Sequence, residues 1–183
     1  NLTKLIASEG TFALAIDAAA AVAGTNILEI SRDVTATTKT IPADVVFVPK
    51  DGAIITVPNG VTLTINSEIP ASVGPRQIFN CTGTGAVVLT GSPTFTVFPE
   101  WWGAVGDFVA PVGAGTNDRP AILAAIAAAP EGATIQFSPK DYKVSGGSLT
   151  IDRQMYLVGC GHGFVGSGSP ATIVDHGTGL YFD

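Results

Sequence analysis

Short apolar runs rich in Val, Ile, Leu and Thr, each bounded by Gly, Pro, Asn or Asp, dominate residues 41–98 and predict strands. They read VVFVP, AIITVP, VTLTIN, QIFNC, AVVLTG and TFTVFP, at intervals of roughly 8 to 12 residues. Within residues 61–65 three aliphatic side chains alternate with two threonines, which predicts one buried and one solvated face. An antiparallel sandwich and a solenoid of short strands both satisfy this pattern, so the two architectures stay open.

Two Ala-rich stretches interrupt the strand pattern and predict short helices. Residues 10–23 read GTFALAIDAAAAVA and stop at Gly24, and residues 117–130 read NDRPAILAAIAAAP and stop at Gly132. A strand begins three residues after each glycine, so we interpret the two stretches as a repeated helix–strand unit. The small alanine side chains suit a helix that covers an open end or edge of a β-rich module.

Four residues of the second stretch are predicted to have structural roles. Asp118, or Asn117 before it, is expected to cap the helix by accepting a hydrogen bond from a backbone N–H of the first turn. Ile122 and Ile126 are four residues apart and share one helix face, which we expect to be buried. Gly132 ends the helix.

The composition predicts a folded, β-rich body and argues against several function classes. Charged residues make up 13% and hydrophobic residues 46% of the 183 residues, the opposite of a disordered chain. The net charge is −6 and the nine Lys and Arg are scattered, so we predict no nucleic-acid partner and no membrane partner. Two cysteines, no phosphate loop and no metal-ligand spacing predict neither a metal nor a cofactor.

Residues 99–175 resemble a known family in the order of three motifs. These are PEWWGAVGD, NDRPAILAAIA with EGATIQFSPKDY after it, and YLVG. They are similar to the start of the pectate-lyase-like right-handed parallel β-helix proteins. There the pattern is roughly W-F-G-A-x-G-D-G, then D-D-T-x-A-I-x-x-A-I, then G-G-x-V-x-F-P-x-G-x-Y. The matching residues are Trp101, Trp102, Gly103, Ala104, Gly106, Asp107, Asn117, Asp118, Ala121, Ile122, Ala125, Ile126, Gly132, Ile135, Phe137, Pro139, Tyr142 and Leu157-Val158-Gly159. Phe108, Arg119 and an APVGAG insertion depart from the pattern in the loop before the second helix.

The resemblance implies a mainly β fold, a right-handed parallel β-helix with short Ala-rich capping helices. Residues 1–98 would form a strand-rich lead module with a short helix at about residues 10–23. Residues 99–183 would form a connector, a capping helix and the first turns of the β-helix, which we expect to continue beyond Asp183.

Among such proteins the chain is most like the N-terminal part of a bacteriophage tailspike or depolymerase. This likeness implies a homotrimer in the virion tail, bound to other tail proteins. The whole protein would bind bacterial surface polysaccharide, and its degradation by the same protein is left open. Two alternatives stay open: a secreted bacterial polysaccharide lyase or glycoside hydrolase, and a non-catalytic structural adaptor or adhesin.

The segment itself is predicted to be non-catalytic, although it contains candidate residues for catalysis and carbohydrate contact. His162 lies in a Gly-His-Gly triplet like that of polygalacturonases, but the carboxylates which that chemistry needs are missing just upstream. Asp175 precedes a histidine, yet adjacent residues of a strand point to opposite faces. Trp101 and Trp102 are carbohydrate-contact candidates, and we favour packing beneath the second helix instead.

Overall fold

The computed structural model describes residues 3–6, 12–24, 26–91, 95–109, 113–159 and 179–182. Strands make up 32% of the structure, helices are few, and every sheet is parallel. This confirms the mainly β class and rules out the antiparallel sandwich. Within the described ranges, no helix is long and apolar enough to cross a membrane.

The described elements are short strands, two α-helices and two 3-10 helices. They are β1 (Thr3–Ile6), α1 (Phe12–Ala21), β2 (Asn26–Ile30), β3 (Val34–Thr35), β4 (Lys39–Ile41), β5 (Val45–Pro49), β6 (Ile55–Val57), β7 (Thr62–Ile65), η1 (Ala71–Val73), β8 (Phe79–Cys81), β9 (Ala86–Leu89), β10 (Thr96–Val97), η2 (Pro99–Trp102), α2 (Arg119–Ala128), β11 (Thr134–Gln136), β12 (Asp141–Val144), β13 (Tyr156–Val158) and β14 (Gly179–Phe182).

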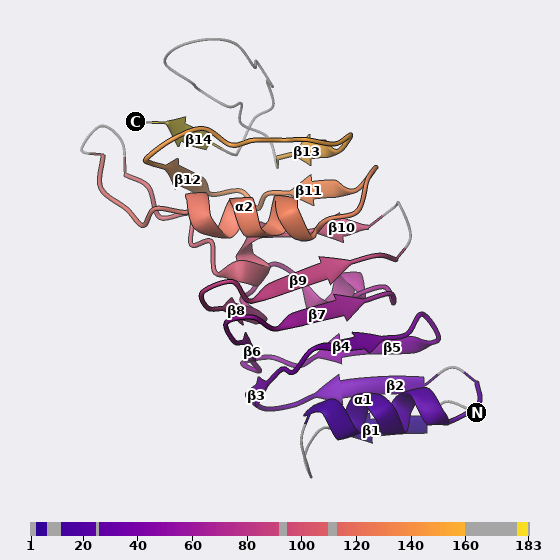
Figure 1. The fold of residues 1–183 in the computed structure, drawn as a ribbon. Helices are drawn as coiled ribbons and strands as arrows, with labels where there is room; N and C mark the ends of the chain where they lie inside the picture. The colour runs from indigo at the N-terminus through magenta and orange to yellow at the C-terminus, as the bar shows by residue number, and fades with distance from the viewer. Residues whose placement is uncertain are drawn as a thin grey trace.

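From β2 to β10 consecutive strands belong to different sheets, whereas β1 and β2 share one sheet and β10 and β11 share another (Figure 1). The strand orders are β1-β2-β5, β3-β6-β8 and β4-β7-β9, followed by β10-β11-β13 and the pair β12-β14. Lys39 pairs with Leu63, and Leu63 with Val87, so the register returns after 24 residues. The sequence runs predicted as strands therefore stack upon one another.

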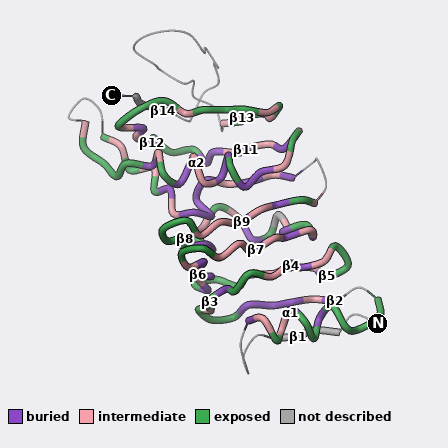
Figure 2. The backbone as a smooth tube through the Cα atoms, viewed as in Figure 1, coloured by how far each residue is buried: buried purple, intermediate pink, exposed green. Residues whose placement is uncertain are grey.

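Alternate residues of the strands are buried and belong to one hydrophobic core, and Figure 2 marks the buried positions in purple. In β5 the inward residues Val45 and Phe47 are fully buried, and in β7 Leu63 and Ile65 are fully buried. The threonines of β7 are only half-buried, as the alternation of residues 61–65 predicts.

Both helices lie in crossovers between neighbouring parallel strands. The chain runs β1–α1–β2 near its start and β10–η2–α2–β11 later on, which supports the repeated helix–strand unit. α1 also packs against β4, and α2 packs against β9. The two helices thus cover opposite edges of the sheet β4-β7-β9, and Figure 1 shows them in one column with its strands.

The burial of α2 agrees with the sequence prediction, whereas its position among the stacked strands could not be read from the sequence. Ile122 and Ile126 are 0% and 3% exposed, and Leu123 is half-buried. α2 covers the edge of one sheet, but β11 and β13 lie beyond it and continue the stack (Figure 1). It is therefore an edge cover inside the molecule and not a lid at its end.

Candidate functional site

The connector between β10 and α2 contains two buried acids, Glu100 and Asp118, and two buried tryptophans, Trp101 and Trp102. It begins with η2, whose Pro99 fits the first turn and whose Gly103 ends it with a left-handed backbone at φ 90°. All four residues of η2 are buried, including Glu100. η2 packs closely on α2 and β8, so the connector contacts both the sheet β3-β6-β8 and the helix that follows it.

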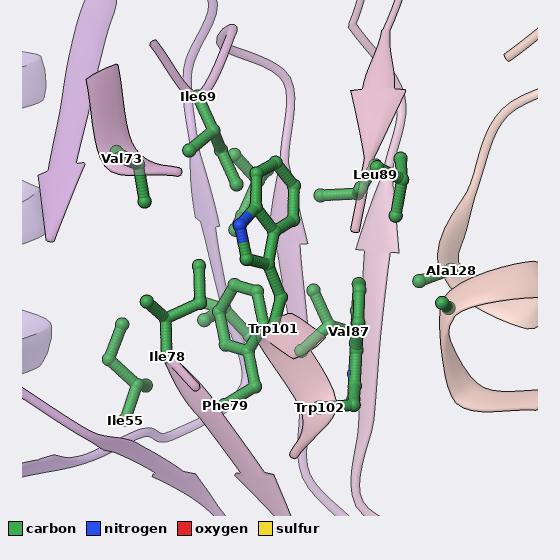
Figure 3. Packing of buried hydrophobic residues seen from close by; sticks show 14 of the residues in the cluster. Ile55, Ile69, Val73, Ile78, Phe79, Val87, Leu89, Trp101, Trp102 and Ala128 are labelled. Carbon is green, nitrogen blue, oxygen red and sulfur yellow. The ribbon is translucent and has the colours of Figure 1, made fainter. Parts of the chain in front are cut away.

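Trp101 and Trp102 are packing residues in this structure. They are 1% and 9% exposed, and Figure 3 shows both indoles among aliphatic side chains of the core. The Trp101 indole N–H donates to the carbonyl of Gly74 at 2.9 Å. The Trp102 ring lies 5.2 Å from that of Phe79, centroid to centroid. Neither ring offers an open face to a sugar, which agrees with the packing interpretation.

Asp118 holds three backbone N–H groups that are distant in sequence. Its Oδ1 accepts from Val105 at 2.6 Å, and its Oδ2 accepts from Gly106 and Lys143 at 3.2 Å each. The side chain is almost wholly buried. Burial raises the pKa of this carboxyl, while the three donors oppose that rise.

The predicted cap by the Asp118 side chain is wrong. The residue occupies the cap position with helical backbone angles, φ −81° and ψ −8°, and its side chain makes no bond to the helix. Asn117, the alternative cap, is the residue whose Oδ1 accepts from the Arg119 N–H at 3.2 Å. That Oδ1 also accepts from Ser145 N–H at 3.0 Å. The Asp118 carboxylate thus bonds three part-buried backbone N–H groups of other segments and none of its own helix.

A second buried carboxyl, Glu100, meets the phenol of Tyr142. The Tyr142 hydroxyl donates to Glu100 Oε1 and accepts from the Ser138 N–H at 3.2 Å. Glu100 is 2% exposed, and its Oε2 has no hydrogen-bond partner within the described structure. Burial, with the adjacent Glu100, raises the pKa of Tyr142 far above its usual range. The sequence match included Tyr142 but gave no signal for Glu100.

These carboxyls are poor candidates for hydrolysis or elimination on a polymer. Both Glu100 and Asp118 are buried and already bonded, so neither can reach a polymer chain from outside. Asp107 is exposed, and its two oxygens bond the N–H and hydroxyl of Thr116 at 2.6 and 3.0 Å. The Thr116 N–H lowers the pKa of Asp107, which makes it a weak proton donor at neutral pH.

Several sequence candidates fall outside the part of the chain that the structure describes. They are His162, Asp175, His176 and Cys160. Cys81 is described, is half-buried, and has a thiol pKa raised by burial. No group of three or more His, Cys, Asp or Glu residues that could hold a metal occurs in the described ranges.

Tyr156 is a candidate contact residue that the sequence reasoning missed. It lies on β13 directly beside Thr134 of β11, which in turn pairs with Thr96 of β10. Its side chain is 57% exposed, whereas the adjacent Leu157 is half-buried. Alternation over a three-residue strand was too short to tell the outward face, so no signal in the sequence separated Tyr156 from a core residue.

No protein-family model matches the chain, and neither a curated protein nor a solved structure matches it.

Proposed function

We propose that this chain is the N-terminal segment of a right-handed parallel β-helix protein of the tailspike or tail-fibre type. One observation carries the proposal: parallel partners recur in register down three sheets. Lys39, Leu63 and Val87 stack in one sheet, while Val34 pairs with Ile55 and Ile55 with Phe79 in another. A chain that visits three sheets in turn and then repeats has the connectivity that a β-helix requires.

In this proposal the segment links the virion-attachment part of a homotrimeric spike to its polysaccharide-binding turns. The buried connector supports that role, because Asp118 and the pair Glu100–Tyr142 fasten segments 25 and 42 residues apart. A spike must transmit force along its length, and a bonded connector resists the separation of neighbouring turns.

The outer surface supports a polysaccharide as the partner. Thr35, Thr56 and Asn80 stand side by side across the sheet β3-β6-β8, and Thr40 pairs with Thr64 in the next sheet. Such uncharged hydroxyl and amide groups can exchange hydrogen bonds with sugar hydroxyls. The exposed ring of Tyr156 adds a flat apolar face suited to the C–H side of a sugar.

The buried state of Glu100 and Asp118 favours a segment without catalytic activity. A purified chain of residues 1–183 is therefore expected to release neither reducing ends nor unsaturated products from bacterial polysaccharides. Release of either product that His162→Ala abolishes would overturn the non-catalytic assignment.

The full-length polypeptide tests the rest of the proposal. Light scattering should give three times the chain mass, and surface plasmon resonance should detect binding to purified capsular or O-antigen polysaccharide. A monomer that cleaves polysaccharide would favour a secreted lyase or hydrolase. A trimer that binds no polysaccharide would favour a structural adaptor and contradict the proposed function.

A further inference from the structure

A hollow of about 220 Å³ lies between the end of β5 and η1. The sheet β1-β2-β5 ends at β5, and the next pass of the chain forms η1 at this place instead of a further strand in that sheet. The hollow is lined by Pro49, Lys50, Asp51, Ser72, Val73 and Arg76, with Val48 at its side. It therefore combines two cations, an acid and a hydroxyl with aliphatic surface.

Arg76 is fixed in this hollow by backbone carbonyls. Its Nη1 donates to the Val73 carbonyl, and its Nη2 donates to the Pro49 carbonyl at 2.5 Å. Its Nε is buried and has no hydrogen-bond partner among the residues described. A guanidinium carries five N–H groups, so these two carbonyls leave donor capacity unused.

The counter-ion of Arg76 is held loosely. Asp51 Oδ1 lies 3.2 Å from Arg76 Nη1, but the Asp51 side chain is 97% exposed while that of Arg76 is 24% exposed. An ion pair with so exposed a partner contributes little, because water competes for the carboxylate. Asp51 can therefore leave the guanidinium at small cost.

Lys50 differs from Arg76 because its counter-ion is nearly buried. Its Nζ lies 3.2 Å from Glu29 Oε2, and the Glu29 side chain is 11% exposed. The Lys50 side chain remains 49% exposed at the rim of the hollow. The ammonium thus stays in place and still has N–H groups directed to solvent-accessible space.

We propose that this hollow binds a sugar acid, with the ligand carboxylate displacing Asp51 from Arg76. The planar guanidinium fits a carboxylate, and Lys50 adds a second charge-assisted contact. Ser72 supplies a hydroxyl for the sugar's own hydroxyls, and Pro49 and Val73 supply apolar surface for its C–H groups. The inference rests on the proposed function and gives its polysaccharide a chemical class, one that carries carboxylates.

If the ligand displaces Asp51, removal of the Asp51 carboxylate should strengthen binding of the sugar acid. Calorimetric titration of the full chain with D-glucuronate should give a Kd about two- to fivefold lower for Asp51→Asn than for wild type. Lys50→Ala and Ser72→Ala should each raise the Kd. Arg76 is left unchanged, because its bonds to two carbonyls make it part of the fold.

Asp44→Asn is the matched control, since it removes an exposed acid just before β5, at the other end of that strand from Asp51. It should leave the Kd for D-glucuronate unchanged. Equal strengthening by both variants would mean a general charge effect and would contradict the proposal. Absence of binding by wild type and Asp51→Asn alike would also overturn it.

D-Glucose and acetate separate the parts of the ligand. If D-glucose binds as tightly as D-glucuronate, the carboxylate is irrelevant and the proposal fails. If acetate binds as tightly, the hollow takes any carboxylate and the sugar-acid assignment fails. The proposed function is tested separately. Strong binding of a neutral polysaccharide, unaffected by Asp51→Asn, would refute the sugar-acid site in the hollow and leave the proposed function standing. Tighter D-glucuronate binding by Asp51→Asn, without any polysaccharide binding by the full-length protein, would refute the proposed polysaccharide-binding function and leave the sugar-acid site standing.

Discussion

Tyr142 donates its phenolic hydrogen to Glu100, a residue 42 positions earlier in the chain, and both side chains are buried. The pair joins η2 of the connector to β12, so it closes a loop that contains all of α2. The hydroxyl bonds Glu100 Oε1, and Oε2 has no hydrogen-bond partner in the described structure, so the phenol is the main polar contact of this carboxyl.

Tyr142→Phe should therefore lower the free energy of unfolding by about 2 kcal/mol, the usual cost of leaving a buried acceptor unsatisfied. The ring contact with Phe137, 5.3 Å between centroids, should survive the change. Urea unfolding followed by circular dichroism measures the loss. A variant as stable as the wild type would mean that water already satisfies Glu100.

The same pair predicts a loss of stability at high pH. The pKa of Tyr142 is raised in the folded protein by burial and by Glu100, so the native state keeps a proton that the unfolded state releases above pH about 10. The stability due to this proton is complete below that pH and falls as the pH rises further. The stability difference between wild type and Tyr142→Phe should shrink by at most about 1.4 kcal/mol per pH unit there. A difference that is constant from pH 8 to 11 would contradict this.

Asp118→Ala should lower the free energy of unfolding by about 3 kcal/mol, more than the loss of a helix cap, because it leaves three backbone N–H groups without their acceptor. Asn117→Ala is the matched control at the neighbouring position. Asn117 is exposed, so water can replace its bonds and its loss should cost about 1 kcal/mol or less. Thermal melting of the two variants measures both losses of stability. Equal losses would mean that Asp118 contributes no more than an ordinary helix cap.

The strands and the buried face of α2 could be predicted because they depend on local alternation. Leu63, Ile65, Ile122 and Ile126 are buried as their spacing requires. The relative direction of paired strands could not be predicted, because parallel and antiparallel strands with one solvated face share the same alternation.

The polar contacts of the connector escaped prediction for a different reason. Asp118 meets partners 12, 13 and 25 residues away, and no local rule ranks these against the helix N–H groups beside it. Glu100 resembles any surface acid in the sequence, and only tertiary packing shows that it is buried. For His162 and Asp175, which lie outside the described residues, the sequence interpretation stays a prediction.

Ile126→Asp should destabilise the protein by several kcal/mol, because it places an unpaired carboxylate where α2 covers the edge of β9. Ala127→Asp is its control, since Ala127 is the next residue of the same helix and is exposed. The first variant should be insoluble or melt far below wild type, and the second should melt within a few degrees of it. A soluble Ile126→Asp protein with unchanged melting would refute the role of α2 as an edge cover.

Tyr156→Ala should weaken polysaccharide binding by the full-length protein about three- to tenfold, whereas Tyr156→Phe should bind almost as wild type. The reason is that a sugar would stack on the ring, and we take for this contact the range of aromatic pairs, about 0.5–1.5 kcal/mol beyond the buried area. Val158→Ala is the matched control, because Val158 is exposed on the same face of β13, two residues on. It should leave the Kd unchanged while the melting temperature of all three variants stays near wild type. If Tyr156→Ala and Val158→Ala weaken binding equally, the face is a general apolar contact and Tyr156 is not a stacking platform. If neither matters, the polysaccharide binds elsewhere on the protein, and the outward turn of Tyr156 on β13 has no part in recognising it.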